Sequence, residues 1–283
     1  MMKEYYFLFT LAFLFTVFAS IQDIRKREVS NWLNFSLVAF ALAYRFFYAS
    51  FLGEWKFFIF GLIGFGIFFF LGQIMYYSRG FGGGDVKLLF GYGVILPYSN
   101  YSDLIFFSLG FFILLLLVGA VYSLIYSVMI VYSYKGKFAK EFSLNYKKYN
   151  RFILFALVFG ILISIFSGFN FIFIYLGMFV FFSSILFIYL RALDSCMIIL
   201  KNSKDLSEGD WVEKEVIVGG KVIGKSVHGL SLKDIKLLNR YNKKILIKEG
   251  VPFVPAFLIT LIIMVFFFLV SKGEVYGLFS FFP

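Results

Sequence analysis

The stretch RGFGGGDVKLLFGYG (Arg79–Gly93) places three consecutive glycines and an aspartate between two apolar runs. A run of membrane length ends at Tyr77, and a second apolar stretch begins at Val86. Asp85 therefore stands at the start of a helix expected to lie within a membrane. An ionisable side chain at membrane depth is costly unless a partner or a function retains it, so the partner of Asp85 has to be identified.

The composition predicts an all-α polytopic membrane protein. Of the 283 residues, 61% are hydrophobic and 15% are charged, and the mean hydropathy is +0.88. The chain has one cysteine, Cys196, which excludes an internal disulfide framework and a four-cysteine zinc site. Its single histidine, His228, argues against a histidine-rich metal centre and a Ser-His-Asp triad. We expect neither a metal nor a cofactor.

Apolar run lengths predict about eight transmembrane helices, because about 20 apolar residues are needed to cross roughly 30 Å of hydrocarbon. The predicted helices are Tyr5–Gln22, Trp32–Leu52, Phe57–Tyr77, Val86–Tyr98, Leu104–Tyr132, Phe152–Ser167, Phe171–Leu190 and Phe253–Val270. The fourth has only 13 residues and is too short to cross unaided. We expect it to begin at some depth inside the protein, where the glycine run is surrounded by other helices or by a wet cavity.

The distribution of basic residues predicts the orientation, because Lys and Arg collect in cytoplasmic loops. With the amino terminus outside, the internal loops hold 23 of the 27 Lys and Arg residues. The external ends and loops then hold only Lys3, Lys56 and Lys272, and Arg45 lies near the outer end of the second helix. We therefore predict a multi-pass protein of the cell membrane with a retained first helix. The net charge of +11 is interpreted as a topology signal, and no nucleic-acid partner is expected.

Three regions are predicted: a membrane domain of seven helices over residues 1–192, a small cytoplasmic α+β segment over 193–250, and a final transmembrane helix with an external tail over 251–283. In the middle region, polar and apolar residues alternate around Gly219-Gly220, which predicts a two-residue β-hairpin. The stretch SLKDIKLLNRYNKKI predicts a helix with Ser231 as its N-cap. A substrate-docking lid and a passive loop both fit this segment.

Two acids are not explained as ordinary solvated charges. Asp23 lies at the predicted inner end of the first helix, and Asp85 lies at the inner start of the fourth. The topology therefore brings both carboxylates to one face of the membrane at similar depth. Structural explanations exist, because Asp85 could be a helix N-cap and Asp23 could pair with Arg27. However, an aspartate at a helix carboxyl end opposes the helix dipole, which favours a functional reason for Asp23.

Two neighbouring carboxyl groups are suited to activating water. Both cannot be ionised at neutral pH when they are close, so the pair shares one proton. One group then acts as the base toward water while its protonated partner polarises the scissile carbonyl. Gly82, Gly83 and Gly84 have no Cβ and allow an extended substrate backbone to approach, and Lys87 is a further candidate for substrate binding.

At these residues the sequence resembles a known family. Gly82-Gly83-Gly84-Asp85 matches the Gly-x-Gly-Asp motif of intramembrane aspartic proteases, and its continuation Val86–Leu89 looks like that of the type IV prepilin peptidases. Asp23, followed by a basic stretch that includes Arg25 and Arg27, is similar to that family's first aspartate motif. The resemblance covers roughly residues 10–130, and Leu206–Val212 and Ile247–Ile259 also look like the carboxy-terminal part of archaeal members.

The resemblance implies an aspartic endopeptidase with Asp23 and Asp85 as catalytic residues. Such an enzyme removes the short basic leader, a class III signal peptide, from prepilin-like or preflagellin precursors on the cytoplasmic face. Bacterial relatives with N-methyltransferase activity usually carry paired cysteines, so no methylation is expected here. A basic leader gains nothing from nearby basic loops, and Glu28 and Glu141 are the candidate acidic contacts. The sequence does not define the oligomeric state.

Two alternatives stay open from the sequence. Presenilin-type proteases share the glycine-aspartate motif, and Pro255-Ala256 is similar to their proline-alanine element. They lack the Val-Lys-Leu-Leu continuation, and Gln22-Asp23 departs from their tyrosine-aspartate pair. A proton- or cation-coupled transporter could also use two membrane acids and a glycine-broken helix. No internal repeat supports a transporter.

Overall fold

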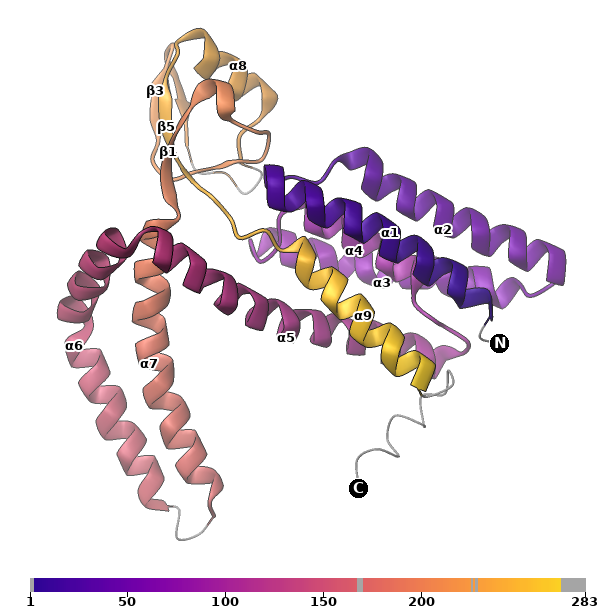
Figure 1. Ribbon diagram of the computed structural model, residues 1–283, viewed down its shortest axis with the longest axis horizontal. Helices are drawn as coiled ribbons and strands as arrows, with labels where there is room; N and C mark the ends of the chain where they lie inside the picture. Colours follow the sequence, from indigo (N-terminus) through magenta and orange to yellow (C-terminus); the bar gives the residue numbers. More distant parts are fainter. Residues whose placement is uncertain (1–2, 167–169, 225, 227–228, 271–283) are drawn as a thin grey trace. The chain divides into compact units, whose positions relative to one another are not determined.

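The computed structural model describes residues 3–166, 170–224, 226 and 229–270 (Figure 1). His228 and the expected external tail over 271–283 lie outside the described residues. Contacts divide the described chain into two compact units. The first contains the residues up to Leu124 together with those from Gly250 onward, and the second is Ile125–Glu249. These units do not test the three-region organisation, which stays a prediction.

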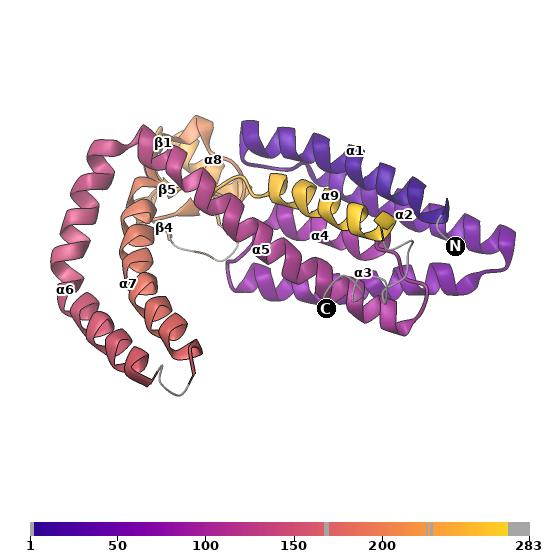
Figure 2. The same cartoon turned by 60° about the horizontal axis from the view of Figure 1, so that its bottom comes forward.

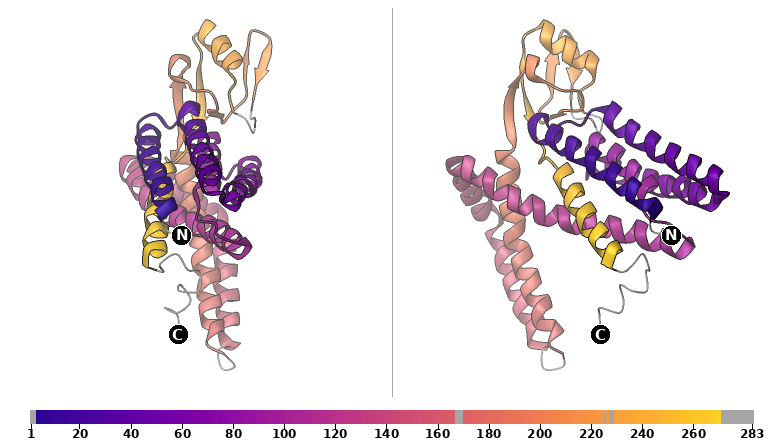
Figure 3. Two further views of the ribbon diagram at one scale, coloured as in Figure 1. Left: turned by 90° about the vertical axis from the view of Figure 1, so that its right-hand side faces the viewer. Right: turned by 45° about the vertical axis from the view of Figure 1, so that its right-hand side comes forward.

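The first unit is a helical bundle in which α1, α2, α3 and α4 run alongside one another and α9 packs against α1 (Figures 1 and 3). Its helices are α1 (Lys3–Lys26), α2 (Asn31–Leu52), α3 (Trp55–Tyr77), α4 (Gly83–Ile95), the first part of α5 (Tyr101–Ser133) and α9 (Val254–Val270). The short helix α4 contacts both α2 and α3, and nine of its 13 residues are buried. Aromatic rings complete this core, with Tyr92 stacked on Phe111 at a centroid distance of 4.7 Å.

A buried arginine closes the carboxyl end of α4. Arg45, on α2, is fully buried and donates three hydrogen bonds to backbone carbonyl oxygens. Its Nε donates to Val94 at 2.6 Å, and its two Nη atoms donate to Phe57 at 2.6 Å and to Leu96 at 2.7 Å. The last carbonyls of a helix have no intrahelical partner, and they carry a partial negative charge. Arg45 therefore satisfies the end of a helix that stops inside the protein.

Close backbone contact holds α4 against α3. A Cβ on Gly93 would lie 2.5 Å from the carbonyl oxygen of Gly64, and a Cβ on Gly64 would collide with the carbonyl oxygen of Gly93. The two helices approach at this point because neither glycine carries a side chain. Together with Arg45, this contact fixes the position of α4 along its own axis.

The second unit contains a helical hairpin and a small sheet domain (Figure 2). The hairpin is α6 (Lys135–Ile165) and α7 (Ile172–Cys196), which approach closely where Gly160 meets Gly177. Beyond α7, β1 (Ile198–Asn202), β5 (Lys244–Lys248) and β2 (Trp211–Val212) form an antiparallel sheet in the order β1-β5-β2. The remaining elements are η2 (Ser203–Asp205), the hairpin β3 (Val216–Val218) and β4 (Lys221–Ile223), and α8 (Leu232–Arg240).

The fold class predicted from the sequence is confirmed. Within the described residues, six helices are long and apolar enough to cross a membrane, namely α1, α2, α3, α5, α6 and α7. The apolar helices α4 and α9 are shorter, at 13 and 17 residues. The hairpin at Gly219-Gly220 is also confirmed, and positive φ values of 56° and 78° explain why glycine occupies both positions. Ser231 is the N-cap of α8 and accepts a hydrogen bond from the Asp234 amide.

Three local predictions were wrong. Residues 135–151 were expected to form a loop because six basic residues interrupt the apolar pattern, but they form the first turns of α6. The helix after Ser231 ends at Arg240, and Lys244–Lys248 is a strand, because Ile245 and Ile247 turn inward into the small core. Finally, α4 begins at Gly83, so Gly82 is its N-cap and Asp85 lies in the first turn.

Replacing Gly64 with alanine is expected to destabilise the first unit by about 1–3 kcal/mol, because the new methyl group overlaps the Gly93 carbonyl. The matched control is Gly66→Ala, two residues along the same helix, where a Cβ has open space. Thermal unfolding of both variants in detergent measures the difference. Equal stability of the two variants would contradict the close contact between α3 and α4.

The stability of α8 is expected to decrease in acid. Hydrogen bonds from Lys221 and Ser231 hold the pKa of the Asp234 carboxyl below its usual range. This carboxylate therefore stabilises the fold above the ordinary aspartate pKa of about 3.9, and the contribution is lost as the pH falls through the lower folded pKa. Amide hydrogen exchange in α8, corrected for intrinsic rates, should show this loss. Asp234→Asn is the control, and its α8 should be less protected at neutral pH and show a smaller dependence on pH.

Candidate active site

Asp23 lies in the last turn of α1 with 7% of its surface exposed. Its Oδ2 accepts a hydrogen bond of 2.9 Å from the backbone N–H of Val254, the first residue of α9. A carboxylate opposes the dipole at the end of its own helix, but it is favourable at the amino end of another. The position of Asp23 is thus stabilised by α9, which follows it by 231 residues.

Asp85 is the third residue of α4 and is partly buried. Its Oδ2 accepts a hydrogen bond of 3.1 Å from the backbone N–H of Gly82, the N-cap of the helix. A carboxylate in the first turn is favoured by the helix dipole. Gly82, the first glycine of the run, therefore supplies the amide that orients Asp85.

Contacts between α1 and α4 show that the two aspartates face each other. Near the start of α1, the Tyr5 hydroxyl donates to the carbonyl of Tyr98, which lies just beyond the end of α4, so the helices are antiparallel. In the middle, the Thr16 and Tyr92 hydroxyls are 2.8 Å apart.

Seven residues, about two helical turns, separate Thr16 from Asp23, and seven also separate Asp85 from Tyr92. Because the helices run in opposite directions, the same register that joins Thr16 to Tyr92 sets Asp23 opposite Asp85. The charges of the two carboxyl groups interact, which agrees with this register.

The start of α2 holds the glycine run and the first turn of α4. A Cβ on Gly84 would lie 3.4 Å from the Val29 side chain, and the Asn34 side-chain amide donates to the Gly84 carbonyl at 3.2 Å. One turn further along α4, the Lys87 ammonium donates to the Asn31 side chain at 2.6 Å. Two hydrogen bonds from α2 and the packing of Val29, just before α2, thus fix the backbone on both sides of Asp85.

The loop before α4 is also tied to α9. Phe81 is buried, and its ring lies 5.0 Å from that of Phe253 and 6.1 Å from that of Phe257. Arg27, at the end of the connection from α1, donates from its guanidinium to the carbonyl of Gly250 at 3.3 Å. The start of α9 therefore contributes to this site together with α1, α2 and α4.

The site thus brings together most of the residues expected from the sequence. Asp23 and Asp85 lie opposite each other at one end of the helix pair, and Gly82 and Gly84 contact Asp85 and α2 respectively. Lys87 is two residues beyond Asp85 and binds Asn31 on α2 instead. Sequence reasoning did not identify Asn34, the Thr16–Tyr92 pair or the Val254 amide. Thr16 carried a usable signal, because it is a polar residue in an apolar run at helical spacing from Asp23. The Val254 amide carried none, because a main-chain group has no sequence signature.

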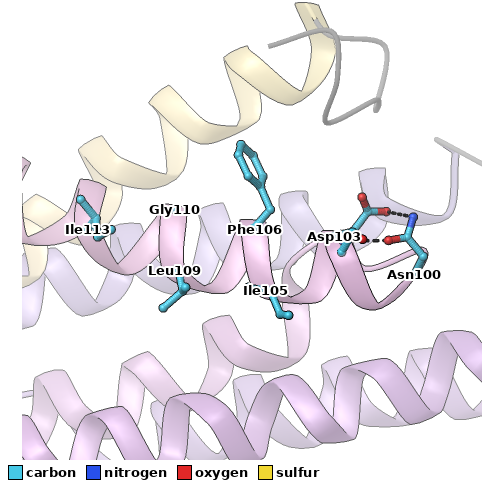
Figure 4. A pocket seen from close by; sticks show the side chains of 8 residues that line it. Asn100, Asp103, Ile105, Phe106, Leu109, Gly110 and Ile113 are labelled. Atoms are coloured by element: carbon cyan, nitrogen blue, oxygen red, sulfur yellow. Dashed lines mark hydrogen bonds between the residues drawn. The ribbon is translucent and has the colours of Figure 1, made fainter. Parts of the chain in front are cut away.

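A separate groove of about 630 Å³ lies on α5, and its lining includes Asn100, Asp103, Phe106 and Gly110 (Figure 4). Asp103 accepts hydrogen bonds from the Ser99 amide and from the Asn100 side chain, so it organises the start of α5. This groove begins beyond the carboxyl end of α4, whereas the two aspartates lie near the amino end of α4. Among the described residues, no group of three or more His, Cys, Asp and Glu side chains is placed to hold a metal ion.

These features define a polytopic membrane protein in which two buried or partly buried carboxyl groups lie at the same end of a pair of antiparallel helices. Residues 9–128 match the model of the type IV leader peptidase family. This segment includes both aspartates, the glycine run, most of α1, and all of α2, α3 and α4. The family resemblance expected from the two aspartate motifs is confirmed over this segment, which is less than half of the chain.

Two preflagellin peptidases are similar to part of the chain. The protein from Methanococcus maripaludis is 33% identical over 94 residues, which are 33% of this chain and 40% of the relative. The protein from Methanocaldococcus jannaschii is 34% identical over 82 residues, which are 29% of this chain and 35% of the relative. The matched segments therefore span well under half the length of these relatives. No solved structure matches the chain.

The register of α1 and α4 is expected to bring cysteines at positions 23 and 85 within reach of a short cross-linker. In a Cys196→Ser background, Asp23→Cys with Asp85→Cys should cross-link rapidly. Asp23→Cys with Asp103→Cys is the control pair, because the start of α5 lies beyond the opposite end of α4. A proteolytic cut between the two positions, followed by a gel, measures the linkage. Equal yields for both pairs would contradict the register.

Proposed function

We propose that this chain is a membrane aspartic endopeptidase that removes the leader from prepilin-like or preflagellin precursors. The observation that carries this proposal is the antiparallel register of α1 and α4, which sets Asp23 opposite Asp85 beside a glycine run. The similarity of residues 9–128 to type IV leader peptidases supports the same reaction. The two partial relatives that are named preflagellin peptidases support the substrate class.

The proposed reaction uses one shared proton. The ionised carboxylate removes a proton from water as the water oxygen attacks the scissile carbonyl carbon, while the protonated partner donates its proton to the carbonyl oxygen. The resulting tetrahedral intermediate breaks its C–N bond as the leaving amine takes the proton from the carboxyl group that had received it from water. The other carboxylate takes the proton from a hydroxyl of the intermediate, which restores the shared proton. The Val254 amide donates to Oδ2 of Asp23, and the Gly82 amide donates to Oδ2 of Asp85. Each side chain is therefore oriented for this exchange.

The glycine run is the proposed docking point for the substrate backbone. Gly83 has space beside it, since the nearest atom to a Cβ there is a Tyr76 ring atom at 3.8 Å. A Cβ on Gly82 would press against the Asp85 carboxylate at 3.3 Å, so glycine at position 82 keeps this carboxylate accessible. An extended peptide can approach such a backbone closely. The proposed cut lies at the junction between a basic leader and the apolar helix of the substrate. If that helix lies beside the helices of this protein, its junction is level with the two aspartates at the proposed inner end of α1. Glu28 is exposed next to Val29 and is the candidate contact for the leader's basic residues.

The proposal includes the cytoplasmic face as the location of the reaction and excludes N-methylation of the product. The location rests on the distribution of Lys and Arg, and the absence of methylation rests on the lack of paired cysteines. A presenilin-like protease would cut within the apolar helix of a substrate, and a transporter would cut nothing. The position and chemistry of the new amino terminus therefore distinguish the three functions.

Co-expression with a leader-bearing precursor should show leader removal by the wild-type chain. Asp23→Asn and Asp85→Asn should each reduce the rate by about 10²- to 10⁴-fold, because an amide neither accepts the proton from water nor returns it. Asp103→Asn is the matched control, since Asp103 is also a buried acid, and should retain processing. A gel shift of the precursor measures the rate.

Mass spectrometry of the product completes the test. We expect an unmethylated amino terminus at the junction between the basic leader and the apolar helix. Undiminished processing by either aspartate variant would contradict the proposal. A cut within the apolar helix would point instead to a presenilin-like protease.

A further inference from the structure

The first turns of α6 carry a basic surface that the proposed function does not use. The exposed basic residues of these turns are Lys135, Lys137, Lys140, Lys147, Lys148 and Arg151, and we call the last four the α6 basic stripe. Lys140, Lys147 and Arg151 are separated by seven and four residues, so they lie on one face of the helix. Lys148 borders the same face. The sequence predicted a loop here, and a loop would not have aligned these charges.

The opposite face of the same turns is aromatic and packs against α7. Phe138, Phe142 and Tyr149 are separated by four and seven residues and are partly buried. The Phe138 ring lies 5.5 Å from that of Tyr189, and the Tyr149 ring lies 5.5 Å from that of Phe187. These contacts hold α6 in one rotation about its axis. The basic stripe therefore faces away from α7.

The register of α6 against α7 sets the depth of the stripe. The two helices are antiparallel, because Gly160 meets Gly177 near one end and the Lys137 ammonium donates to the Ile198 carbonyl at the other. The stripe lies between these two contacts. It runs beside the last turns of α7, where the apolar run ends at Leu190 and the exposed Arg191 follows.

This depth corresponds to lipid headgroups. The helix α6 has 31 residues and is about 46 Å long, which exceeds the hydrocarbon thickness of roughly 30 Å. Its second half is apolar and largely exposed, as expected for a surface in contact with acyl chains. The charged first turns must then leave the hydrocarbon, and long Lys and Arg side chains can reach the interface from there.

We propose that the α6 basic stripe binds the headgroups of anionic phospholipids. The positive-inside effect alone explains an excess of basic residues but not their alignment on one exposed face above an apolar surface. Anionic headgroups supply the complementary charge at the required depth. A basic leader peptide does not fit this surface, because its charge has the same sign.

Lipid binding to the full chain in detergent tests the proposal. The variant carries Lys140→Gln, Lys147→Gln and Arg151→Gln, and native mass spectrometry measures its affinity for phosphatidylglycerol and phosphatidylcholine. Each basic residue near an anionic surface contributes about fivefold, so phosphatidylglycerol binding should weaken by about tenfold or more. Phosphatidylcholine binding should not change.

The matched control carries Lys233→Gln, Lys236→Gln and Arg240→Gln on α8, which removes three exposed charges at similar spacing. It should bind phosphatidylglycerol as the wild type does, and an equal loss would overturn the proposal. Competition by inorganic phosphate as strong as that by phosphatidylglycerol would indicate a free-phosphate site and overturn it. Tighter binding of an RNA oligonucleotide than of lipid would also overturn it. The single variants Lys140→Gln and Arg151→Gln keep the test decisive if the triple variant misfolds, since each should give part of the loss.

Discussion

The structure depends on hydrogen bonds to the backbone groups at both ends of α4, a helix that stops inside the protein. With 13 residues, α4 is about 20 Å long, and both of its ends leave backbone groups without intrahelical partners inside the protein. Arg45 satisfies the carboxyl end with hydrogen bonds to Val94 and Leu96. At the amino end, the carboxylate of Asp85 accepts the Gly82 amide, and Asn34 on α2 binds the Gly84 carbonyl. Because both ends are fixed, the depth of Asp85 is fixed as well.

That fixed depth allows two helices distant in sequence to present matching groups. The helix α1 needs only one polar contact with α4, between Thr16 and Tyr92, to define the register. Two turns further on, the same register places Asp23 opposite Asp85. The polar groups that α1 and α4 present to each other are thus arranged along a single line. In an apolar environment, a polar group without a hydrogen-bond partner is costly. These polar pairs therefore specify how α1 aligns with α4, which apolar side chains alone would define poorly.

The sequence predicted the parts of this fold that follow from local chemistry. Apolar run length identified the membrane helices, paired glycines identified the hairpin, and Ser231 identified the start of α8. The prediction failed for residues 135–151, because helical aromatic contacts with α7 override a high density of charge. It also failed for Lys244–Lys248, which pairs with β1 across more than 40 residues. At the site, both carboxylates were predictable from their side chains, whereas the Val254 amide was not.

The bond between Asp23 and the Val254 amide creates a mechanical link along the chain. Only five residues separate the end of β5 at Lys248 from Val254, and that strand is the central strand of its sheet. Tension or rotation in this short tether acts directly on the first amide of α9, and therefore on the carboxylate that this amide holds. The five-residue backbone segment and this hydrogen bond thus connect the central strand of the small sheet to a buried acid of the helical bundle.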